Sequence, residues 1–178
     1  NLYILSDHFR PSFKIMGERF SQSISSLENF HVKHIPTPKS EEERITISKS
    51  ADIALHITQG DAFIPIDKCY NIAQPWHEWS KYPKEWVNIL NSFDEIWCPT
   101  NHIQEILINS GLQVPSFKVA PALTLKQISQ KSSWNNQDPL RIYFVGEPHF
   151  RKGHHLLMQG FIKAFPKEGE AQLTIKTS

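Results

Sequence analysis

The feature that most constrains the fold is a repeated alternation of short strand-like runs with helix-like patterns. The strand-like runs, which carry β-branched or aromatic residues, lie at residues 2–5, 32–35, 52–57, 68–72, 95–98 and 117–120. A helical pattern at residues 12–28 separates the first two, with Phe13, Met16 and Phe20 at three- and four-residue steps. This alternation is typical of α/β proteins with a mainly parallel sheet. We expect residues 1–123 to form a Rossmann-like domain.

Capping residues mark where two further helices begin or end. Thr100 stands just before a periodic apolar segment, and its hydroxyl is suited to cap a helix N-terminus. Gly111 follows the same segment, where a left-handed glycine commonly ends a helix. Pro83 precedes another amphipathic segment, and proline is favoured in a first helical turn. We therefore predict helices directly after Pro83 and between Thr100 and Gly111.

Residues 124–138 differ in composition from the segments on either side. Lys, Gln, Ser and Asn dominate this stretch, which is typical of a linker between domains. The elements predicted after it are a strand at 141–145, a loop at 146–153, a helix at 154–165 and a strand at 173–176. They make one βαβ unit. One such unit cannot cover both faces of its sheet, so we expect residues 139–178 to be the incomplete start of a second domain. Its helix should turn four apolar side chains inward: Leu156, Leu157, Phe161 and Phe165.

The charge balance and hydropathy exclude several classes of partner. The chain has 19 Lys and Arg against 18 Asp and Glu, a net charge of +1, so no global field draws it to nucleic acid. No apolar stretch approaches the roughly 20 residues that span a bilayer. We expect a cytoplasmic protein with no transmembrane segment and no nucleic-acid partner.

The sequence offers no motif for a metal or a nucleotide cofactor. His8, His56 and His102 share no metal-ligand spacing, and we interpret them as packing or solvent residues. The pair His77-Glu78 is followed by Lys81 where a zinc protease has its second histidine. The GxGxxG and P-loop motifs do not occur. We expect neither a metal nor a cofactor.

The loop at residues 146–153 is the strongest candidate for a binding site. It joins a predicted strand to a predicted helix, and open α/β sheets bind ligands at the carboxyl ends of their strands. Arg151 and Lys152 could neutralise a diphosphate, and the amides after Gly153 add the partial positive charge of a helix start. The alternative is a solvated charged loop with a glycine at a tight turn.

Two blocks of sequence resemble one enzyme family in the same order. Tyr-Phe-Val-Gly at 143–146, Arg-Lys-Gly at 151–153, Leu-Leu at 156–157, Ala-Phe at 164–165 and Leu-Thr-Ile-Lys-Thr at 173–177 resemble the first βαβ unit of the donor domain in family-4 retaining glycosyltransferases. Pro-Lys-Glu-Trp-Val at 83–87, residues 93–101, Glu78 and Ser110-Gly111 resemble the last part of that family's acceptor domain. The resemblance covers roughly residues 75–178.

This resemblance implies a two-domain GT-B fold, with residues 1–123 as the acceptor-side domain. It implies a retaining, hexosyltransferase-type enzyme that transfers a sugar from a nucleotide sugar to an acceptor glycan or small molecule. The lysine matching Lys152 holds the donor diphosphate in that family, so the implied diphosphate site is Lys152, Arg151, Gly146 and Gly153. The donor is a substrate, and the class needs no metal.

The chain departs from the family at two points. The family often has a basic residue after the glycine that matches Gly146, whereas this chain has Glu147, whose charge would repel a diphosphate unless it points away. The two glutamates that grip the donor in the family would lie beyond residue 178. We therefore expect the catalytic residues outside this sequence, and expect that an incomplete second domain could self-associate.

A second candidate site is the aromatic segment at residues 74–79. Trp76, His77 and Glu78 follow a predicted strand, and aromatic faces commonly pack against sugar rings, which indicates an acceptor-side loop. The alternative is that Trp76 and Trp79 are hydrophobic covers while Glu78 caps the next turn.

For the whole chain, the rival interpretation is a non-catalytic α/β module that binds a sugar or a nucleotide. This interpretation accounts for the absence of the family's two donor-binding glutamates without requiring that the protein continue beyond residue 178. A further domain's worth of α/β pattern after residue 178 would favour the transferase.

We expect the 178-residue chain by itself to transfer no sugar. Holding donor and acceptor in register between two closed domains can lower a barrier by roughly 7–11 kcal/mol at its limit, and this sequence contains only the start of the second domain. A product assay with a panel of nucleotide sugars checks this, and turnover by the isolated chain would contradict it.

Overall fold

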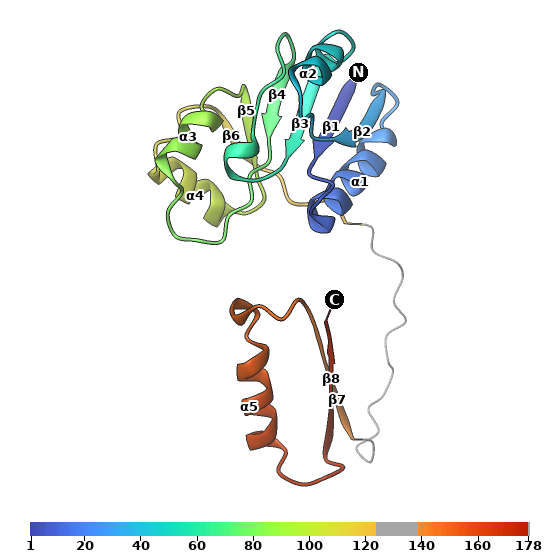
Figure 1. Cartoon of the computed structure of the whole chain (residues 1–178), viewed down its shortest axis with the longest axis vertical. Helices are drawn as coiled ribbons and strands as arrows, with labels where there is room; N and C mark the ends of the chain where they lie inside the picture. The colour runs from blue at the N-terminus through green and yellow to red at the C-terminus, as the bar shows by residue number, and fades with distance from the viewer. Residues whose placement is uncertain (124–138, 178) are drawn as a thin grey trace. The chain divides into compact units, whose positions relative to one another are not determined.

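The chain consists of two compact units, each described here by itself. The computed structural model describes residues 1–123 and 139–177, shown in Figure 1. The first unit ends at Lys126 and the second begins at Gln127. The predicted linker at 124–138 lies outside the described residues.

The first unit is an α/β fold built on a parallel sheet, as the alternating sequence pattern predicts. Its six described strands run in the order β2-β1-β3-β4-β5-β6, and every neighbouring pair is parallel. The strands are β1 (Leu2–Ser6), β2 (Val32–Pro36), β3 (Ile53–Ile57), β4 (Tyr70–Ala73), β5 (Glu95–Cys98) and β6 (Ser116–Lys118). This arrangement is consistent with a Rossmann-like fold.

Helices cover both faces of this sheet (Figure 1). They are α1 (Pro11–Ser25), α2 (Glu41–Ser48), α3 (Lys84–Leu90) and α4 (Asn101–Asn109), with a short 3-10 turn η1 (Gly60–Ala62) after β3. Phe13 and Phe20 of α1 pack on Ile4 and Leu55, which point to one face. α2 packs on the opposite face beside Leu5, and α3 and α4 join it around Ile96 and Cys98. The sheet extends from β1 to β2 on one side and to β3 on the other. Because crossovers between parallel strands are right-handed, connections that run in opposite directions place their helices on opposite faces of the sheet.

The capping chemistry of α4 is as predicted. The Thr100 hydroxyl accepts a hydrogen bond from the amide of Ile103 at 3.2 Å. Gly111 has a φ of +103°, and the amide of Leu112 reaches back to the carbonyl of Leu107 at 3.0 Å. This is a Schellman motif, which satisfies carbonyl groups that the helix end leaves unpaired.

The second unit contains the expected strand, helix and strand. β7 (Leu140–Val145) pairs in parallel with β8 (Ala171–Lys176), and α5 (His154–Ala164) connects them after a 3-10 turn η2 (Phe150–Lys152). Phe161 and Phe165 are partly buried, with ring centroids 5.3 Å apart. The prediction for Leu156 was wrong, since its side chain is 62% exposed. One helical step of about 100° turns it away from the face of Leu157.

A buried hydrogen-bond network joins β3 to β4 in the first unit. His56 is 1% exposed, and its Nε2 lies 3.1 Å from Asn71 Oδ1, which also accepts from the amide of Ile66 at 2.7 Å. Because Asn71 Oδ1 can only accept, His56 must donate from Nε2. Burial lowers the pKa of His56 to about 4, against the opposing effect of the hydrogen bond to Asn71. This agrees with the interpretation of His56 as a packing residue.

We predict that His56 makes folding stability fall with acidification. Between pH 6.5 and about 4 the unfolded state binds a proton at His56 that the folded state does not, so stability is lost as the pH falls through this window. The loss is on the order of 3 kcal/mol when complete. Denaturant unfolding of wild type and His56→Leu across this window measures it.

The matched control is His102→Leu, because His102 is exposed on α4. The His102 variant should keep the wild-type pH slope, and the His56 variant should have a shallower one. Equal slopes for all three proteins would contradict the role of His56.

Candidate functional site

The loop at residues 146–153 lies where the sequence predicts it, between the carboxyl end of β7 and the start of α5. The amide of Gly146 donates to the carbonyl of Lys176 at 3.1 Å, which ties the loop start to the end of β8. Arg151 and Lys152 lie within η2 and are exposed. The four residues of the implied diphosphate site therefore occur in one loop of the second unit.

The two glycines of this loop differ in what they require. Gly153 has a φ of +71° and stands at both the end of η2 and the start of α5. A side chain there would be strained by roughly 1–2 kcal/mol. Gly146 has no such constraint, because an added Cβ would meet only the Phe144 ring at an ordinary 3.6 Å. The backbone thus needs glycine at 153 and accepts other residues at 146.

The electrostatics of this loop suit an anion. The first amides of an α-helix have no carbonyl partner within the helix and carry partial positive charge, and in α5 they follow directly after Lys152 and Gly153. The Glu147 carboxylate lies 3.2 Å from His149 Nε2. Glu147, the residue at which the chain departs from the family, is therefore directed to a partner within its own loop.

An aromatic pair at the same loop was missed from the sequence. Phe150 stacks on His155 with ring centroids 4.0 Å apart at 17°, and Phe150 is 80% exposed. An apolar residue directly before Arg151 and Lys152 in a polar loop was the available signal. The pair offers a flat apolar surface one residue from the basic side chains.

The aromatic segment at 74–79 follows β4 and has mixed roles. Trp76 packs against the core cluster beneath α1, which supports its interpretation as a hydrophobic cover. His77 Nε2 lies 2.8 Å from the carbonyl of Lys81, and the His77 ring packs 4.5 Å from that of Tyr82. Glu78 is exposed, and Trp79 is 65% exposed, so Trp79 is not a cover.

Buried polar atoms of this segment lack partners among the described residues. They are Gln74 Oε1, Trp76 Nε1 and the hydroxyl of Tyr82. Gln74 and Tyr82 are almost completely buried, and burial raises the pKa of Tyr82. Unsatisfied buried polar atoms are uncommon and often occur at functional sites. Residues 74–82 thus contain two buried donors and one buried acceptor that no described residue satisfies.

A second polar cluster, at the ends of β1 and β3, was also missed from the sequence. Arg10 Nη1 donates to Gln59 Oε1 at 2.7 Å, and Arg10 Nε lies 3.5 Å from an Asp7 carboxylate oxygen. Arg10 and Gln59 are 49 residues apart in sequence. No local pattern predicts such a contact, because the sheet topology creates it.

Two histidines meet beside this cluster. His8 Nε2 lies 3.3 Å from His34 Nε2, and Ser6 Oγ lies 2.7 Å from the same His34 atom. The pKa of His34 is lowered, first by burial and then by His8. Gly17 of α1 makes this arrangement possible, because a Cβ at this position would clash with His34 Nε2 and Ser6 Oγ. His8, interpreted from the sequence as a packing or solvent residue, thus packs against a second histidine.

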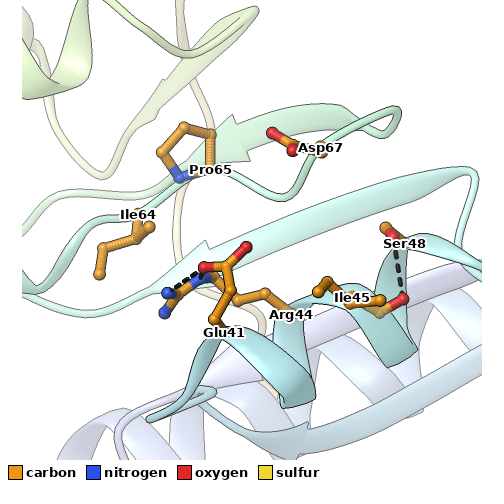
Figure 2. A pocket seen from close by; sticks show the side chains of 7 residues that line it. All are labelled: Glu41, Arg44, Ile45, Ser48, Ile64, Pro65 and Asp67. Carbon is orange, nitrogen blue, oxygen red and sulfur yellow. Dashed lines mark hydrogen bonds and ion pairs between the residues drawn. The ribbon is translucent and has the colours of Figure 1, made fainter.

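The described surface also has a pocket of about 280 Å³ between α2 and the segment that follows η1. Figure 2 shows its lining, with Arg44 turned to Glu41 on one side and Ile45, Ile64 and Pro65 around the opening. None of the site residues predicted from the sequence lines this pocket. The pocket is therefore separate from both candidate loops.

No family model, curated protein or solved structure significantly matches this chain. Within residues 1–123 and 139–177, no helix combines the length and apolar character needed to cross a membrane. No group of three or more His, Cys, Asp or Glu side chains in these ranges forms a candidate metal site.

We predict that Gly17→Ala destabilises the first unit by about 1–3 kcal/mol, the usual cost of overpacking. The new Cβ would lie 2.4 Å from His34 Nε2 and 2.8 Å from Ser6 Oγ, so the histidine pair would have to move. Ser23→Ala, at an exposed position of the same helix, is the control. Denaturant unfolding compares the two variants, and equal midpoints would contradict the close approach at Gly17.

Proposed function

We propose that this chain is part of a retaining glycosyltransferase of the GT-B type, similar to family 4, which uses a nucleotide sugar to glycosylate a glycan or small-molecule acceptor. The second unit would bind the donor, and the first would bind the acceptor. The proposal rests on the site rather than on the α/β fold, which many unrelated functions share.

The observation that carries the proposal is the arrangement of Lys152, Gly153 and α5 after the carboxyl end of β7. A lysine immediately before a left-handed glycine, followed by the unpaired amides of a helix start, combines mobile and fixed positive charge at one point. A diphosphate leaving group gains negative charge during sugar transfer, and preorganised donors of this kind stabilise it. Arg151 would add a second cation.

On the acceptor side we propose the loop that carries Trp76, His77 and Glu78. The contact between His77 Nε2 and the Lys81 carbonyl fixes the loop, and exposed Trp79 offers an aromatic face for a sugar ring.

The proposal predicts that Lys152→Ala weakens the binding of a nucleoside diphosphate. Loss of a charge-assisted contact costs about 1.5–3 kcal/mol, so the dissociation constant for UDP or GDP should rise roughly tenfold or more. Isothermal titration calorimetry with both nucleotides measures it.

Lys163→Ala is the matched control, since Lys163 is an exposed lysine in the last turn of the same helix. It should leave the dissociation constant within about twofold of wild type. Equal weakening by both substitutions would remove the special role of Lys152. Failure of the wild-type chain to bind any nucleoside diphosphate would remove the donor site.

A further inference from the structure

We propose that the first unit has a binding site for the phosphate group of a phosphorylated sugar or polyol, formed by residues 7–10 with Lys39 and Gln59. We call it the β1–β3 site. It lies where the strand order reverses, because the chain leaves β1 to one side for β2 and returns on the other side as β3 (Figure 1). Open α/β sheets bind ligands at the carboxyl ends of strands at such a reversal.

Arg10 is held in place at this reversal by two side chains from different strand ends. Its Nε faces Asp7, which follows β1, and its Nη1 donates to Gln59, which follows β3. The remaining N–H groups of the guanidinium have no acceptor among the described residues. A guanidinium fixed in this way can offer two parallel hydrogen bonds to a phosphate with little loss of conformational entropy.

Lys39 supplies a second cation from the loop after β2. Its backbone amide donates to Glu43 Oε2 at 2.6 Å, which anchors it at the start of α2. Its ammonium lies 4.1 Å from the centroid of the Phe9 ring. Phe9, the neighbour of Arg10 in the chain, is 77% exposed. The Lys39 ammonium lies over the exposed Phe9 ring, and Arg10 is the next residue in the chain. Both cations are thus close to one exposed aromatic side chain.

The chemistry of the ligand follows from these groups. Asp7 and Glu43 together balance the two cations, so the preference for a phosphate monoester over a neutral sugar rests on the remaining N–H groups of Arg10 and on the Lys39 ammonium rather than on net charge. An exposed Phe ring suits the apolar face of a sugar or polyol skeleton. Lys14 is a poorer candidate because Glu18 already lies 3.9 Å from its ammonium.

The inference depends on the proposed function only where it identifies this ligand as the acceptor. As a binding site it stands alone, because all its residues belong to the first unit, whereas the donor loop belongs to the second.

Calorimetry on the 178-residue chain tests this with glucose 6-phosphate, glycerol 3-phosphate and glucose as probes. At least one phosphorylated probe should bind, and glucose should bind at least about tenfold more weakly than glucose 6-phosphate. Arg10→Gln and Lys39→Gln should each weaken the phosphorylated probe by about tenfold or more, because each removes a charged contact.

Lys33→Gln is the matched control, because Lys33 also lies over an aromatic ring, that of Tyr3 at 5.2 Å, but lies within β2 rather than after it. It should leave the binding of the phosphorylated probe unchanged. Circular dichroism verifies that each variant is folded. The proposal is overturned if no phosphorylated probe binds, if glucose binds equally well, or if both site variants bind like wild type. Loss of probe binding in Lys152→Ala would also overturn it by locating the probe at the donor loop.

These outcomes separate the two proposals. Nucleoside diphosphate binding that survives in Arg10→Gln, with loss of the sugar phosphate, supports both sites. Sugar phosphate binding without any nucleotide binding supports the β1–β3 site and contradicts the transferase.

Discussion

The first unit depends on a parallel sheet that must be covered on both faces. Parallel neighbours need long crossovers, and those crossovers are right-handed, so their directions decide which face each helix covers. Side chains such as Ile4, Leu55 and Ile96 become fully buried in consequence, and each contributes about 1.5–3 kcal/mol relative to exposure. The same geometry brings every loop that follows a strand to one edge of the sheet.

This edge is where polar groups of the first unit gather. The sheet interior admits a polar pair such as His56 and Asn71 only when hydrogen bonds satisfy it. Beyond the strand ends, Arg10 and Gln59 meet at the surface, while Gln74 keeps a buried oxygen without a partner among the described residues. Packing thus separates polar groups buried in and beside the sheet from the exposed Arg10–Gln59 contact, which a ligand can reach.

The sequence predicts best where the cause is local. The β5 strand, the Thr100 cap and the Gly111 stop follow from side-chain pattern and capping chemistry within a few residues. The contact of His8 with His34 spans 26 residues and that of Arg10 with Gln59 spans 49, so strand order had to be known first. The loop position of Arg151 and Lys152 could be predicted, because a strand–loop–helix pattern places these residues without information on long-range contacts.

The charge and the backbone of the loop at residues 146–153 act together in one arrangement. Gly153 turns the chain from η2 into α5 with a left-handed conformation, so the residue before it is placed beside the amides that open the helix. A β-branched residue at 153 would be strained by more than the roughly 1–2 kcal/mol typical of other side chains. The turn that leads from Lys152 into α5 therefore requires glycine. Glu147 can be tolerated in the same loop because its carboxylate is directed to His149, four residues before Gly153.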